Sequence, residues 1–118
     1  MHVTGDYLEI LRREVRRVVG LLAERDYDSV VQTCSQSRLT SDDLRNVIHQ
    51  YGGRIIPPPV DAFVNLDAIR IADLPKPGWS VRVPLYTAEE GRSDLTLELT
   101  IILADQGIHI ELEDLHVL

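Results

Sequence analysis

Cysteine, aromatic residues and long apolar runs are all scarce in this sequence. Cys34 is the only cysteine among 118 residues, which excludes an internal disulfide bond and a zinc site built from cysteines. The chain opens without a basic-then-apolar leader, and no apolar run approaches the ~18 residues of a membrane-spanning helix. We therefore expect a protein of the reducing cytoplasm that does not enter membranes.

Positive charge is scarce as well. The chain has 19 Asp and Glu against 12 Lys and Arg, a formal net charge of -7. This balance disfavours nucleic acid and anionic membranes as partners. Basic and aromatic residues are not interleaved as they are on single-strand-binding surfaces, and no glycine-rich phosphate loop or Ser-His-Asp spacing is present. We therefore expect neither a nucleic-acid partner nor a cofactor.

The sequence does contain enough apolar residues for one folded domain. Hydrophobic residues make up 44% of the chain, and a chain of this size buries roughly two thirds of its extended surface on folding. The residue patterns divide this single domain, 1–118, into a helical half at 1–53, a proline-rich crossover at 54–61 and an antiparallel meander at 62–118.

Helical spacing and capping signals predict three helices in the first half. The first begins with a cap at Thr4-Gly5-Asp6 and runs to about Glu24, and a short second helix follows residues 25–28. The third begins at a capping box formed by Thr40 and Asp43 and ends at Gly52. Away from its apolar stripe, the first helix carries four arginines that we interpret as a solvated face balanced by glutamates: Arg12, Arg13, Arg16 and Arg17.

Two reactive side chains in the helical half are predicted to have no chemical role. Cys34 lies one turn after the inward-facing Val30, and no neighbour in the sequence favours its thiolate, so we place it in the core and not at a nucleophilic site. His49 shares the outer face of the third helix with Asp42 and Arg45, so we expect it at the surface.

The alternation of apolar and polar residues from 95 to 112 predicts a hairpin. A four-residue turn closed by Leu103 and Ile108 sets Ile101 opposite Ile110, whereas a three-residue turn opposes Leu103 to His109. We expect the first register because it keeps the apolar side chains on one face. A change of parity at 113–114 predicts a bulge or the end of the strand.

The two earlier strands of the meander are less regular. The alternation in 62–71 is broken, so either a bulge near Ala68 switches the faces or Asn65 and Asp67 point into the interior. The next strand contains Pro84, which has no amide hydrogen for the ladder. We therefore expect that strand at an edge of the sheet, or with a bulge at the proline.

Helices followed by four strands with short turns predict an α+β fold, with N-terminal helices on one face of a four-stranded antiparallel sheet. The long first helix, the segment 26–30, the helix end at 51–53 and the closing meander resemble the cystatin-like roll of the nuclear-transport-factor-2-like superfamily, which includes SnoaL-like proteins and ketosteroid isomerase. The chain also resembles small bacterial domains of this class, some of them proposed toxin-immunity proteins. The resemblance implies a curved sheet, a concave side that is hollow or filled, and frequent dimerisation through the other face.

The inward row of the last three strands carries no ionisable side chain. It consists of Trp79, Val81, Val83, Leu85, Leu95, Leu97, Leu99, Ile101, Leu103, Ile108, Ile110 and Leu112. General acid–base catalysis needs a titratable group within hydrogen-bond reach of the substrate, so this row predicts a packed core. Asn65 and Asp67 are the exception, because an inward Asp67 beside Trp79 could act as a base.

The polar face of the meander offers two further candidate sites. His109, Glu111 and Glu113 alternate on it, and their nitrogen and oxygen atoms can bind metals, although solvated strands are often built of such residues. A candidate protein interface lies on the same face and consists of Arg82, Tyr86, Thr100, Ile102 and His109. The alternative is an ordinary, partly solvated sheet face that happens to contain one isoleucine.

These observations predict a non-catalytic cytoplasmic protein-interaction domain that binds a protein partner or forms a homodimer. Neutralisation of a basic toxin fits both the acidic charge and the resemblance. The alternative is a small-ligand-binding or enzymatic roll that uses Asp67 and Asn65. That alternative requires Asp67 to be buried in a cavity of order ~300 Å³.

Overall fold

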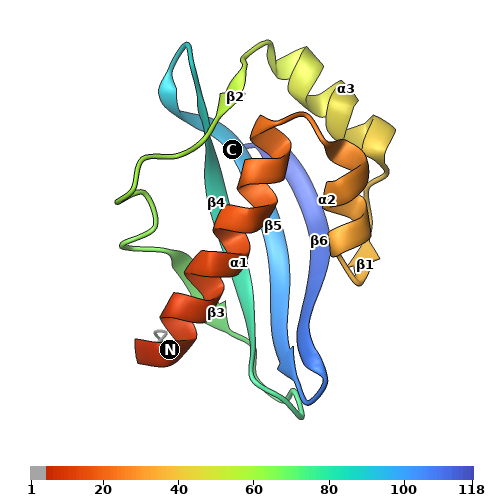
Figure 1. Cartoon of the computed structure of the whole chain (residues 1–118), viewed down its shortest axis with the longest axis vertical. Helices are drawn as coiled ribbons and strands as arrows, with labels where there is room; N and C mark the ends of the chain where they lie inside the picture. The colour runs from red at the N-terminus through yellow and green to blue at the C-terminus, as the bar shows by residue number, and fades with distance from the viewer. Residues whose placement is uncertain (1–4) are drawn as a thin grey trace.

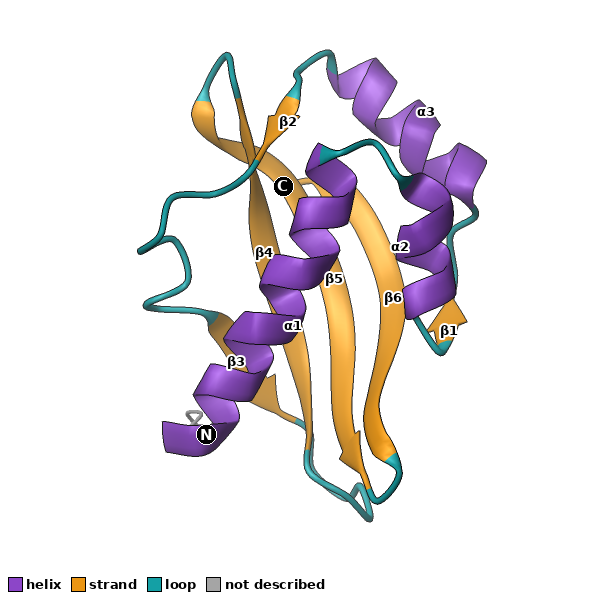
Figure 2. Cartoon of the chain, in the orientation of Figure 1, coloured by secondary structure: helices purple, strands orange, loops and turns teal. Residues whose placement is uncertain are grey.

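The computed structural model describes the backbone of residues 5–118 and the side chains of residues 7–118, so the cap predicted at Thr4 lies outside the described residues. Helices cover one face of a strongly curled sheet, and α1 crosses that face in front of the long strands (Figures 1 and 2). The elements are α1 (Gly5–Ala23), α2 (Tyr27–Thr33), β1 (Gln36–Ser37), α3 (Ser41–Tyr51), β2 (Ile55–Ile56), β3 (Asp67–Arg70), β4 (Gly78–Thr87), β5 (Gly91–Ala104) and β6 (Gly107–Val117).

The sheet is mixed and six-stranded. Its strands follow the order β1-β6-β5-β4-β2, and β3 also pairs with β4. The predicted α+β class is confirmed, but the predicted four-stranded antiparallel sheet is wrong, because β1 runs parallel to β6 and β2 adds an antiparallel pair at β4. Both additional strands have two residues. A segment this short has no alternation that a sequence pattern could reveal.

The register of the closing hairpin is the predicted one. Leu103 pairs with Ile108 and Ile101 pairs with Ile110. One further pair, Ala104 with Gly107, tightens the connection, and Gly107 adopts a positive φ of 129° that favours glycine. The even register therefore places the apolar side chains of β5 and β6 on the helix-facing side.

The change of parity near the end of β6 is a bulge, which is one of the two predicted explanations. Glu98 pairs with Asp114, but the next residue of β5, Leu99, pairs with Leu112. Glu113 is therefore the extra residue of β6. The bulge returns Leu115, which is 3% exposed, to the core. It also places Asp114 on the outer face opposite Glu98, which determines the candidate site described below.

Residues 62–71 do not form one strand. Turns occupy 60–65, and only Asp67–Arg70 is extended and paired with β4. Ala68 faces the core, while Asp67 and Ile69 are exposed. Phe63 reaches the core from the turn and is 2% exposed. The broken alternation thus has a third explanation, because its first half belongs to a turn in which strand parity does not apply.

Pro84 lies at a bulge, which confirms one of its two predicted positions. The pairing of β4 with β5 shifts between Pro84 and Tyr86. On its other edge β4 pairs with β3 at residues 79–82 and with β2 at 86–87. The proline therefore stands between the two partner strands of that edge, where its missing amide hydrogen leaves no ladder bond unmade.

The core forms where the apolar stripe of α1 meets the inward row of the sheet. Leu11, Val15 and Leu22 of the helix are fully buried, as are Val83 and Leu97 of the sheet. Leu103 and Ile108, at the hairpin end of the predicted row, are partly exposed. Close packing of both rows leaves the long strands with one dry side and one wet side.

The arginines of α1 do more than solvate a helix face. Arg12 donates hydrogen bonds of 2.9 Å to the carbonyls of Phe63 and Val64. Arg16 donates to the carbonyl of Val60, and its guanidinium lies 5.0 Å from the centroid of the Phe63 ring. Because these contacts span more than 40 residues of sequence, helix periodicity could not predict them. They fasten the turn at 60–65 to α1.

Local hydrogen bonds fix the ends of α2 and α3. Asp26 caps α2 by accepting from the Ser29 amide. The predicted capping box of α3 is present in both directions between Thr40 and Asp43, and Gly52 ends the helix in the left-handed region at φ 90°. Of the helices in the described residues, none combines the length and the apolar character needed to cross a bilayer.

Candidate functional site

The face of β4, β5 and β6 that is turned away from the helices is lined by polar and charged side chains. The strand register sets Arg82 opposite Glu98, and Glu98 in turn opposite Asp114. Thr96 pairs with His116 one step further along the same two strands. Three strands of 10–14 residues hold these groups, so their spacing is fixed by the ladder and not by a loop.

Glu98 is the centre of a small ion-pair cluster on this face. Its Oε2 lies 2.6 Å from Nε2 of His116, and its Oε1 accepts a 3.3 Å hydrogen bond from Nε of Arg82. The hydrogen bond to Glu98 raises the pKa of His116 above its ordinary value, and the negative charges of Asp114 and Glu98 add to the effect. Such exposed pairs contribute little stability. They fix the orientation of the Glu98 carboxylate and the His116 imidazole on the sheet face.

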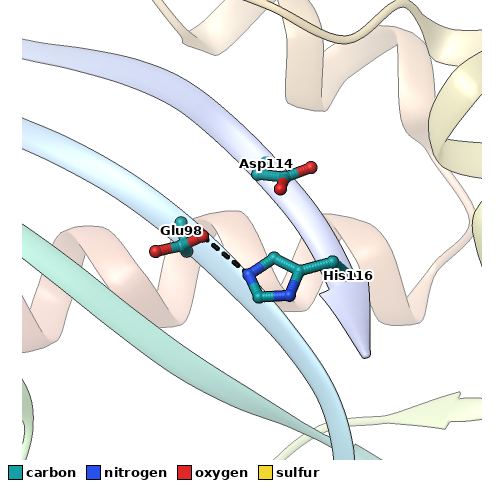
Figure 3. A group of neighbouring side chains, drawn as sticks. All are labelled: Glu98, Asp114 and His116. Carbon is teal, nitrogen blue, oxygen red and sulfur yellow. Dashed lines mark hydrogen bonds and ion pairs between the residues drawn. The ribbon is translucent and has the colours of Figure 1, made fainter. Parts of the chain in front are cut away.

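Glu98, Asp114 and His116 also form a group that could hold a metal ion. One ligand atom from each residue lies within 4.8 Å of the others. Figure 3 shows Glu98 on β5 beside the two residues of β6. Two carboxylate oxygens and one imidazole nitrogen suit first-row divalent ions. The raised pKa of His116 works against such an ion, because metal binding requires the neutral imidazole.

The predicted metal candidates lie elsewhere on β6 and have other partners. Nε2 of His109 lies 2.9 Å from Oε2 of Glu111. The carboxylate of Glu113 accepts hydrogen bonds from Arg38 and Thr100, both at 3.2 Å. Simple alternation joins residues 109, 111 and 113. The bulge at Glu113 breaks that series and brings Asp114 and His116 next to Glu98. The parity change that predicted the bulge was the signal for this group.

The five predicted interface residues share the outer face but are spread along it. Ile102 pairs with His109 near the hairpin end, and Thr100 is the next outward residue of β5. Arg82 lies at the middle of the face, opposite Glu98, while Tyr86 pairs with Arg92 near the other end of β4. The ion-pair cluster of Arg82, Glu98 and His116 thus occupies the centre of the candidate surface.

Asn65 and Asp67 do not point into the interior beneath the helices. Both are exposed, and they line a hollow of about 270 Å³ on the outer side of the sheet together with Arg82, Tyr86 and Arg92. The burial that the enzymatic alternative required of Asp67 is therefore not met. The same hollow brings Asn65 and Asp67 next to two of the predicted interface residues, Arg82 and Tyr86, a proximity that the sequence did not indicate.

Cys34 lies in the core at 8% exposure, where the sequence placed it. Burial raises the pKa of its thiol to about 11, and the nearby positive charge of Arg17 offsets only part of this effect. A thiol with such a pKa is almost entirely protonated at neutral pH and is a poor nucleophile.

Negative charge is concentrated in the half of the chain that builds this face. Residues 54–118 contain 11 Asp and Glu against five Lys and Arg, a net of −6, whereas residues 1–53 contain eight against seven, a net of −1. The carboxylates on or beside the outer face are Asp67, Glu98, Glu111, Glu113 and Asp114. Five of the 19 acidic residues of the chain thus lie on or beside the outer sheet face.

Comparison with known families and proteins gives one match. The family described as "Domain of unknown function (DUF7668)" matches residues 19–118. The matched region begins within α1 and includes every strand, so it contains the whole outer face. No curated protein and no solved structure matches the chain.

Proposed function

Because the chain belongs to the DUF7668 family, whose function is unknown, we propose a function from its surface: it is a protein-binding domain that presents the outer face of β4–β6 to a basic partner protein. The observation that carries this proposal is the row of carboxylates on a sheet face that none of the described helices covers. Strands of this length hold the charges at fixed spacing, so little ordering is needed when a partner binds.

Charge favours a basic partner over a second copy of the chain. The outer face has five carboxylates, against Arg82 and Arg92 on β4 and β5 and Arg38, which pairs with Glu113. Two such faces would repel each other, whereas a cationic surface would be attracted and steered into contact. Neutralisation of a cationic toxin is one role that such binding would serve, and it agrees with the resemblance to immunity proteins.

Packing on the other side of the sheet also favours binding over catalysis. Trp79, Leu97 and Leu99 are at most 1% exposed beneath the helices. The inward row of the sheet is therefore closed to other molecules, whereas its outer face is open to a protein partner. Catalysis by Asp67 and Asn65 is the weaker proposal, because both are exposed to solvent.

Affinity capture with charge variants tests the proposal. The tagged protein and a Glu98→Lys/Asp114→Lys variant are exposed to lysate of the producing cell, and retained proteins are identified and purified for calorimetry. We expect a partner with an excess of Lys and Arg whose affinity falls at least about tenfold in the variant, since like charges then face each other. A Glu24→Lys/Asp28→Lys variant, changed on the helical side, is the matched control and should bind as tightly as the wild type.

Two results would contradict the proposal. One is a partner that binds the outer-face variant and the wild type equally. The other is a concentration-dependent dimer, seen by light scattering, that the Glu98→Lys/Asp114→Lys change disrupts. The second result would assign the face to self-association.

A further inference from the structure

A cavity of about 620 Å³ lies on the helical side of the molecule, away from the outer sheet face. It opens where the connection between α1 and α2, the end of α3 and the start of β2 come together (Figure 1). Its lining includes Arg25, Arg45, His49, Arg54 and Glu89. Three arginines from separate parts of the chain thus converge in a protein whose net charge is −7.

Two of these arginines form no salt bridge. Among the side chains of residues 7–118, no carboxylate forms a salt bridge with Arg25 or Arg54, and neither guanidinium has a hydrogen-bond partner there. Arg45 forms an ion pair with Asp42 and lies 5.5 Å from the centroid of the Tyr27 ring. The cavity therefore holds two free guanidinium groups and a third at its wall.

Glu89 is the carboxylate in this lining, and it forms no salt bridge with the described arginines. Its pKa is lowered, first by the backbone hydrogen bond from Arg54 and also by the positive charge of the Arg54 side chain. Its Oε1 accepts a 2.9 Å hydrogen bond from the backbone amide of Arg54. Gly53 makes this approach possible, because a Cβ there would meet Thr87 at 3.0 Å and the Glu89 oxygen at 3.3 Å. The loop is thus held by its backbone, and the Arg54 side chain is left for another contact.

The backbone at Arg25 gives a second reason to assign a role to this side chain. Arg25 has a φ of 60°, and the amides of Arg25 and Asp26 bond to the carbonyls of Leu22 and Leu21 at 3.0 Å. This is the helix-ending arrangement in which glycine is favoured at the left-handed position. Arginine is less stable there than glycine, so the fold does not require an arginine at this position for its backbone.

Arginines elsewhere on the helical side differ from this pair. A groove of about 520 Å³ beside α1 is lined by Arg12, Arg13 and Arg16. Arg12 and Arg16 donate to backbone carbonyls, and Arg13 pairs with Glu14. In that groove the arginine side chains are bonded to groups of the protein itself. In the 620 Å³ cavity, the side chains of Arg25 and Arg54 have no such bonds among the described residues.

From these contacts we propose that the cavity binds the phosphate group of a small anionic molecule through Arg25 and Arg54, with Arg45 at its wall. The planar guanidinium presents paired donors that match phosphate oxygens. A phosphate dianion neutralises both free arginines, whereas a single carboxylate neutralises one. The volume is in the range of about 300–1,000 Å³ typical of small-molecule sites.

Calorimetric titration with pyrophosphate at low salt tests the site. We expect the wild type to bind and Arg54→Gln to bind about tenfold or more weakly, because a charge-assisted contact is lost. Arg25→Gly should weaken binding by a similar factor while raising the thermal midpoint, because glycine relieves the left-handed backbone. Weaker binding together with a higher thermal midpoint in Arg25→Gly would show that the variant has lost a contact with the anion and not its fold.

Arg92→Gln is the matched control. Arg92 also has no salt bridge among the described side chains, but it lines the hollow on the outer face, so this variant should bind pyrophosphate like the wild type. Titrations with orthophosphate and with ribose 5-phosphate then show whether the site prefers a free or an esterified phosphate. Tighter binding of either one than of the other supports the site. Four results would overturn the proposal. They are no binding of pyrophosphate, an equal loss of affinity in Arg92→Gln, unchanged affinity in Arg25→Gly and Arg54→Gln, and tighter binding of succinate than of pyrophosphate.

Discussion

Leu97 and Leu99 on the helix-facing side of β5 are at most 1% exposed, whereas Glu98 between them is partly exposed and joins an ion-pair cluster with Arg82 and His116. Neighbouring residues of one strand thus serve different purposes. The first side stabilises the fold by burying apolar surface. The second side contributes little stability, so its charges can be arranged for contact with other molecules. The comparison separates the residues that stabilise the fold from those that we expect to contact a partner.

The largest difference between the two sides should appear in stability. We expect Leu97→Ala to lower the free energy of unfolding by about 3 kcal/mol, because it leaves a cavity in a closed core. Glu98→Ala, its neighbour on the outer side, should lower it by less than about 1 kcal/mol. Urea denaturation measures both. Similar losses for the two variants would contradict the division between the sides.

The reactivity of the Cys34 thiol tests the burial of the helix-facing side without a mutation. Burial raises the pKa of Cys34 from 9.0 to about 11. At pH 8 its thiolate fraction should be about a hundredfold below that of an exposed cysteine, and its reaction with a disulfide reagent should be correspondingly slow. The unfolded protein in urea is the control and should react at the ordinary rate. Fast reaction of the folded protein would show that the helical layer opens readily.

The capping box of α3 should have an intermediate effect. Thr40→Ala removes the hydroxyl that accepts from the Asp43 amide, and we expect it to lower the free energy of unfolding by about 1 kcal/mol. Thr40→Ser keeps the hydroxyl and should restore most of the loss. Affinity for a partner of the outer face should be the same in both variants, because α3 lies on the other side of the sheet.

The smallest effect should come from the ion pair on the outer side. Glu98→Gln should lower the pKa of His116, because the hydrogen bond that the ring donates to the Glu98 carboxylate is the main cause of its raised value. A raised pKa in the folded state stabilises the protein below the unfolded value of about 6.5 and ceases to do so as the pH rises through the folded value. The stability lost in Glu98→Gln should therefore be larger near pH 6 than near pH 8.5.

A proton NMR titration of the His116 ring checks this expectation, with His49 as an internal control on the other side of the molecule. An unchanged titration of His116 in Glu98→Gln would mean that the 2.6 Å contact does not persist in solution.

Local patterns predicted the parts of the fold that local physics controls. The capping box at Thr40, the end of α3 at Gly52 and the pairing of Ile101 with Ile110 were all accessible from residue types and spacing. Each depends on neighbours within a few residues or on the period of a single strand. The inward row of β4–β6 followed for the same reason.

Contacts between distant segments lay beyond such reasoning. The parallel pairing of Gln36 with Glu111 and the bonds from Arg12 to the turn at Phe63 join segments more than 50 residues apart. The convergence of Arg25 with Arg54 is of the same kind. No periodicity connects these positions, because their proximity depends on how the helices pack on the curled sheet.

The sequence by itself determined an α+β chain with a dry row on its long strands, an acidic balance and a buried cysteine, since each follows from composition and alternation. Tertiary structure alone decided which polar groups meet. The one-residue bulge at Glu113 brings Asp114 and His116 to Glu98 in place of the predicted series at 109, 111 and 113. Alternation specifies the face on which a side chain lies, whereas strand pairing and helix packing determine its neighbours on that face.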